Sequence, residues 1–76
     1  MDRNDALALT NLRSLLASGE AREIRLAAGL SLQEAGAAAG TSAATIHRYE
    51  GAQRVPHGPV GVRYARFLAT LRKVAT

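Results

Sequence analysis

One stretch near the middle of the chain carries the signals for two short helices joined by a tight turn. Ser31 and Glu34 stand three residues apart, as in a capping box, where each side chain bonds the other residue's backbone N–H. Gly40 predicts the end of this first helix, because glycine takes a positive φ angle without steric strain. Ser42 is a favourable N-cap for a second helix that reaches about Glu50. The chain must therefore turn sharply at Gly40, and this requirement constrains its fold more than any other feature.

The second of these helices carries different residues on its two faces. Ile46 and Tyr49 share one face, whereas Thr45 and Arg48 lie on another. The first helix consists mainly of small residues. Its Gly36 suits a point where two helices cross closely and only a residue without a side chain fits. This pattern predicts a helix-turn-helix, in which a supporting helix holds a second helix free to enter the DNA major groove.

The charge of the chain is concentrated in its second half. The 76 residues suffice for one small domain, and their net charge is +4. Residues 1–38 contain four arginines and five acidic residues, a net charge of −1. Residues 39–76 contain six basic residues and one acidic residue, a net charge of +5. One basic half predicts a polyanionic partner, and the alternative is a surface charged only for solubility.

Several other classes of protein are disfavoured by the composition. There are no cysteines, and His47 and His57 have no carboxylates arranged around them, so we expect no metal site and no cofactor. No apolar run approaches the roughly 20 residues that span a bilayer, and no signal peptide is evident. The serines, histidines and acids form no nucleophile–base pattern, and no glycine loop would cradle phosphate. We expect neither an enzyme nor a small-molecule substrate, but a cytoplasmic protein associated with a bacterial nucleoid.

The remaining pattern predicts an all-α domain. Alanine is abundant, and almost no window alternates between polar and apolar residues with a period of two. We expect helices at about residues 5–18, 20–28, 32–39, 43–50 and 60–74. Asn4 would cap the first, and a loop rich in proline and glycine would separate the last two. The first helix has a stripe of leucines that predicts a buried face, formed by Leu9, Leu12, Leu15 and Leu16.

Residues 20–71 resemble the Cro/repressor-type helix-turn-helix family, also called the XRE family. The resemblance rests on Ile24-Arg25, Gly29-Leu30-Ser31, Gly36, Gly40, Ser42, Ile46 and Tyr49-Glu50. It implies a compact five-helix bundle of the lambda-repressor-like DNA-binding type, with the helix-turn-helix at the third and fourth helices. It implies one domain over residues 1–76, in which residues 1–19 form an extra N-terminal helix and residues 20–71 form the family-like core.

The chain departs from the family pattern at a few packing positions. The family usually has alanine where Gly36 stands and leucine-sized residues where Ala35 and Ala39 stand. It usually has valine in place of Thr41. We expect the leucine-rich N-terminal helix to compensate by burying additional apolar area.

The resemblance also implies roles for individual residues. Base-reading residues would be Ala43, Ala44, Thr45, His47 and Arg48. Phosphate contacts would come from Gln33, Thr41, Ser42, Gln53 and Arg54. Further candidates for the DNA backbone are His57, Arg63 and Arg66. Arg25 and Glu50 would form a structural ion pair behind the helix-turn-helix.

Arg48 is the main candidate for a direct base contact. Its guanidinium matches the O6 and N7 acceptors of guanine, and the alternative is a contact to phosphate. The resemblance implies a phage or bacterial regulator that binds double-stranded DNA as a homodimer on a palindromic operator, as a Cro-like repressor does. Two alternatives remain open. One is an antitoxin-like or other protein-interaction module, and the other is an architectural or excision factor that bends DNA.

Overall fold

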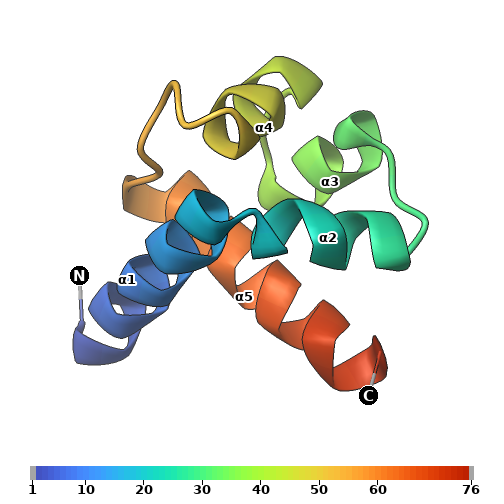
Figure 1. Ribbon diagram of the computed structural model, residues 1–76. Coiled ribbons are helices and arrows are strands. Elements are labelled where there is room, and N and C mark those ends of the chain that lie inside the picture. Colours follow the sequence, from blue (N-terminus) through green and yellow to red (C-terminus); the bar gives the residue numbers. More distant parts are fainter. Residues whose placement is uncertain (1, 76) are drawn as a thin grey trace.

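The computed structural model describes residues 2–75, with the exception of the Ala75 side chain, and these residues form five α-helices and no β-strand. The helices are α1 (Arg3–Ser18), α2 (Glu20–Ala27), α3 (Leu32–Ala39), α4 (Ala43–Glu50) and α5 (Gly58–Ala75). The all-α fold predicted from the sequence is confirmed. In Figure 1, α3 and α4 lie together on one side of the molecule, and α1 and α5 cross on the other.

Local side-chain hydrogen bonds set the bounds of α3 and α4 as the sequence predicts. Ser31 Oγ accepts from the Glu34 N–H at 3.0 Å, and the Ser31 N–H donates to Glu34 Oε1 at 2.9 Å. These bonds lower the pKa of Glu34. Ser42 Oγ accepts from the Thr45 N–H at 3.2 Å, which caps α4. Gly40 ends α3 in the left-handed conformation, with φ of +75°.

Four predicted helix boundaries were wrong, among them the end of α5, which lies at Ala75 rather than at residue 74. α1 begins at Arg3 rather than at Asp5, because the side chain of Asp2, not that of Asn4, caps it by accepting from the Asp5 N–H at 2.8 Å. α2 ends one residue earlier than expected, at Ala27. α5 begins at Gly58 rather than at residue 60, because a proline is tolerated in the first turn, where no intrahelical N–H donor is needed.

The core lies where α5 packs against α1, α2 and α3. The largest fully buried side chains are Tyr64, Leu12, Ile46 and Leu68. The leucine stripe of α1 is buried as predicted, and so are the inward residues of α3 and α4, namely Ala35, Ala39, Ile46 and Tyr49. Four core side chains therefore come from α1, which supports the expectation that this helix compensates for the small residues of α3.

Tyr64 occupies the centre of this core. Its ring stacks on that of Tyr49, with the centroids 6.2 Å apart and the ring planes 26° from parallel. Its buried hydroxyl has no hydrogen-bond partner among residues 2–75. Burial and, to a smaller extent, the Glu50 carboxylate raise the pKa of Tyr64 to about 12, and the Arg25 guanidinium opposes them.

The raised pKa of Tyr64 predicts a loss of stability in alkali. The folded state favours the protonated phenol, and this preference contributes to the free energy of unfolding. The contribution is complete below the pKa of tyrosine in the unfolded chain, near 10, and is lost as the pH rises to about 12, the pKa of Tyr64 in the folded protein. We expect urea denaturation to show a decrease of about 2–3 kcal/mol in the free energy of unfolding over that range. Tyr64→Phe should not show this decrease, since it has no phenol to ionise. An equal decrease in the variant would contradict the assignment.

Candidate nucleic-acid interface

The geometry of the interface begins at the crossing of α3 and α4. A Cβ atom placed on Gly36 would lie 2.9 Å from the backbone carbon of Ser42 and 2.9 Å from the carbonyl oxygen of Thr41. The two backbones therefore approach as closely as the sequence predicts for a residue without a side chain. This contact fixes where α4 starts relative to its supporting helix.

An ion pair fixes the other end of α4. Arg25 on α2 donates to the Glu50 carboxylate through Nε at 2.7 Å and through Nη2 at 2.9 Å. Its Nη1 donates to the carbonyl of Leu30 at 2.8 Å. The two charged side chains are only 7% and 5% exposed, and the hydrogen bond to Glu50 raises the pKa of Arg25. The pair thus ties α2 and the loop before α3 to the last residue of α4.

The outward flank of α4 is open. Ala44, His47 and Arg48 are exposed, and Ala43 beside them is half-buried. They are spaced three and four residues apart, so they form one stripe along the helix. The side chains of His47 and Arg48 make no hydrogen bond or ion pair within the described residues. Four of the five predicted base-reading residues therefore lie on a single accessible face.

Thr45, the fifth residue predicted to read bases, does not belong to that exposed face. It is only 8% exposed, and its hydroxyl lies 3.1 Å from that of Ser42. Its position on α4 turns it toward the first turn of α5, where it lines a hollow with Gly58 and Pro59. Thr45 therefore orders the start of α4 rather than presenting a free group to a ligand.

The candidates for phosphate contact fall into three groups. Thr41 and Arg54 line the same hollow of ≈ 180 Å³ between the starts of α4 and α5, and His57 lines it with them. Ser42 and Gln53 are exposed nearby in sequence, although the Ser42 hydroxyl is already engaged in the α4 cap. Gln33 is exposed in the first turn of α3, at the opposite end of that helix from Gly40. The structure therefore gathers part of the predicted set around one hollow.

The turn after α4 contains a feature that the sequence did not reveal. Ala52 has a φ angle of +58°, the left-handed conformation that usually belongs to glycine. Its N–H donates to the Tyr49 carbonyl at 3.2 Å, and the Gln53 N–H donates to the Arg48 carbonyl at 2.9 Å. These bonds close the end of α4 and direct the loop that carries Arg54. An alanine gives no sequence signal for such a turn.

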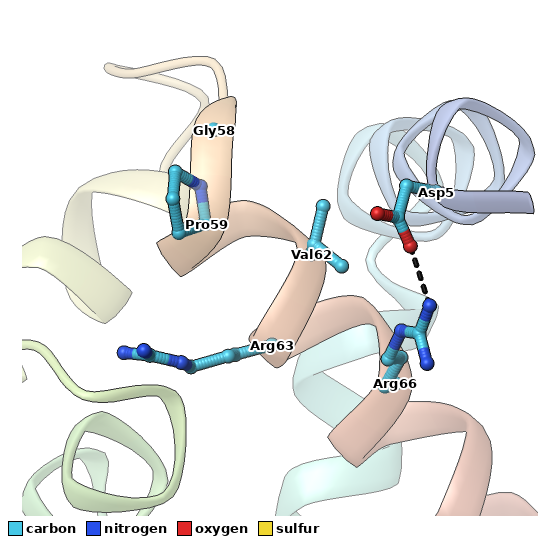
Figure 2. Close-up of a pocket in the computed structure, with 6 residues that line it drawn as sticks. All are labelled: Asp5, Gly58, Pro59, Val62, Arg63 and Arg66. Atoms are coloured by element: carbon cyan, nitrogen blue, oxygen red, sulfur yellow. Dashed lines mark hydrogen bonds and ion pairs between the residues drawn. The ribbon is translucent and has the colours of Figure 1, made fainter. Parts of the chain in front are cut away.

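Two arginines on α5 differ in their surroundings. Figure 2 shows Arg66 turned toward Asp5 on α1, with which it forms a hydrogen-bonded ion pair, and Arg63 extended the opposite way. Arg63 reaches the turn between α3 and α4, where its Nη1 would be 2.6 Å from a Cβ placed on Gly40. Both arginines line a hollow of ≈ 540 Å³ beside the first turns of α5. Arg63 is therefore the better placed of the two to extend the basic surface near α4.

A short helix with an open flank, held by a supporting helix and followed by a basic loop, defines a helix-turn-helix DNA-binding domain. A family model described as a helix-turn-helix domain matches residues 17–75, and the chain belongs to this family. Its fold is a lambda-repressor-like helical bundle in which α3 and α4 form the helix-turn-helix. Neither a curated protein nor a solved structure matches the chain.

Two observations bear on other kinds of site. Within residues 2–75, no group of three or more histidine, cysteine, aspartate or glutamate side chains is placed to hold a metal ion. No helix in the described part of the chain has the length and hydropathy needed to cross a membrane.

Proposed function

We propose that this protein is a sequence-specific regulator that binds double-stranded DNA, and that it acts as a Cro-like repressor by occupying its operator. The observation that carries the proposal is the open flank of α4, where the side chains of Ala44, His47 and Arg48 are exposed and make no hydrogen bond or ion pair within the described residues. The charge of +5 on residues 39–76 supports it, because a basic surface attracts the DNA backbone.

In the proposed complex the first turns of α4 enter the major groove. Arg48 donates to guanine O6 and N7, and the small side chains of Ala43 and Ala44 permit close approach or contact thymine methyl groups. His47 lies beside them and contacts a base or a phosphate. The backbone is held by Arg54 and Gln53 after α4, and by the residues at the starts of the two helices, Gln33, Thr41 and Ser42.

We further propose that the protein binds as a homodimer to a palindromic operator. An α4 of eight residues can contact few base pairs, and a pair of such helices doubles the site. Apolar side chains that two copies could cover are exposed at Val55 in the α4–α5 loop and at Val74 near the end of α5.

Selection of binding sites from random duplex DNA tests this function. We expect enrichment of one palindrome whose half-sites lie about one helical turn, or 10 base pairs, apart. Enrichment of a single half-site would contradict the homodimer but not sequence-specific binding. Strong DNA bending without enrichment would favour an architectural factor. An absence of binding to any duplex would overturn the proposal and favour a protein-interaction module.

Replacing Arg48 should distinguish base reading from general attraction to DNA. We expect Arg48→Ala to weaken binding to the selected site by about 1–3 kcal/mol and to relax the preference at one base pair. Arg54→Ala is the matched comparison, because it removes the same charge from the loop. It should weaken binding to all DNA sequences alike. It should also reduce, by about one unit, the slope of the logarithm of the binding constant against the logarithm of the salt concentration. Equal losses for Arg48→Ala on selected and random duplexes would contradict base reading.

A further inference from the structure

We propose that Arg13 of α1 is a positioning residue for DNA binding, because it holds the α4–α5 loop in the shape that presents Arg54 to the DNA backbone. Residues 3–16 of α1 lie outside the family match, so the family assigns no role to Arg13. The inference deepens the proposed function and rests on it.

Arg13 is bonded to the loop at one point. Its Nε donates to the Pro56 carbonyl oxygen at 3.3 Å, and its Nη2 donates to the same oxygen at 3.1 Å. The two residues are 43 positions apart, so this contact is purely tertiary. Hydrogen bonds from a charged donor are stronger than those between neutral groups. Arg13 therefore clamps the carbonyl that lies just before the start of α5.

Packing also holds this point of the loop. Pro56 is buried, and Leu9 of α1 is only 3% exposed. A Cβ placed on Gly61 of α5 would lie 2.7 Å from Leu9 Cδ2 and 3.2 Å from the Pro56 carbonyl carbon. α1, the loop and α5 thus meet at Pro56, and Arg13 supplies the polar contact at this junction.

Arg54 lies between two fixed points of the loop. On one side, the Gln53 N–H is bonded to the Arg48 carbonyl at 2.9 Å. On the other side, two residues further on, is the Pro56 carbonyl that Arg13 holds. Arg54 and Arg13 line one hollow of ≈ 240 Å³, and the Arg54 side chain is exposed without a hydrogen-bond partner within residues 2–75. A loop ordered before binding spares the entropy of ordering it on the DNA.

Limited proteolysis of the free protein tests the clamp. Trypsin cleaves after Arg54 only when the loop opens, so we expect Arg13→Gln to accelerate this cleavage about tenfold. Arg3→Gln removes the same charge near the start of α1 and should leave the rate unchanged. Cleavage after the buried Arg25 reports global unfolding and should stay slow in both variants. Unchanged cleavage after Arg54 in Arg13→Gln would overturn the inference.

A double-mutant cycle on DNA tests the connection to Arg54. We expect Arg13→Gln to weaken binding to a random duplex about fivefold in the wild-type background, but less than twofold in an Arg54→Gln background. Arg13→Lys keeps the charge but loses the two-donor geometry, so it should restore only part of the affinity.

The outcomes separate this inference from the proposed function. Equal losses in the two backgrounds, or full rescue by lysine, would show that Arg13 contacts phosphate directly and would overturn the positioning role. If the wild-type protein bound no duplex at all, the proposed function would fail together with this role. In that case the cleavage rates would still report whether Arg13 holds the loop.

Discussion

Glu50→Ala is expected to destabilise the protein by about 3–5 kcal/mol, because it leaves the Arg25 guanidinium buried without its counter-charge. A domain of this size has a total stability of only about 4–11 kcal/mol, so the variant should be close to unfolding at moderate temperature. Urea denaturation followed by circular dichroism measures the change. DNA binding should be lost in parallel, since the ion pair fixes the end of α4.

The matched control for this prediction is Glu23→Ala on α2. Glu23 is exposed and its carboxylate makes no hydrogen bond or ion pair within the described chain, so its loss should change the free energy of unfolding by less than about 0.5 kcal/mol. A Glu50→Ala variant as stable as Glu23→Ala would show that the Arg25–Glu50 pair does not hold α4 in place.

Gly36→Leu is the second substitution with a large expected effect, about 3 kcal/mol or more. The first atom of a side chain there would already be 2.9 Å from the backbone of residues 41 and 42, and backbone atoms cannot rotate away. The helices α3 and α4 would have to separate, which would displace the flank that carries Arg48. Thermal denaturation and binding to the selected DNA site would measure the two consequences.

Ala37→Leu provides the control on the same helix. Ala37 is the next residue of α3 and is exposed, so leucine there should change stability by no more than about 0.5 kcal/mol. If Gly36→Leu melted at the same temperature as Ala37→Leu, the close crossing of α3 and α4 would be refuted.

The features that the sequence predicted correctly are mostly local. Ser31, Glu34, Gly40 and Ser42 act on backbone groups within a few residues of themselves, so their pattern alone identifies the ends of α3 and α4. The start of α1 was misplaced because two capping residues, Asp2 and Asn4, stand close together and the sequence does not rank them.

The features that the sequence missed depend on distant parts of the chain. Thr45 is buried and lines a hollow with Gly58 and Pro59 of α5, and periodicity within α4 does not report that neighbour. The clamp of Arg13 on Pro56 joins residues 43 positions apart, and nothing near Arg13 signals it. The Arg25–Glu50 pair spans 25 positions and was anticipated only through the family resemblance.

Amide chemical shifts measured while duplex DNA is added to the isotope-labelled protein would test most directly whether the outward flank of α4 meets the duplex. We predict that the largest changes occur at Ala43, Ala44, His47 and Arg48, with smaller ones in the loop around Arg54. The signals of residues 3–10 of α1 should remain nearly unchanged. Largest changes in that part of α1, with α4 unaffected, would contradict the account.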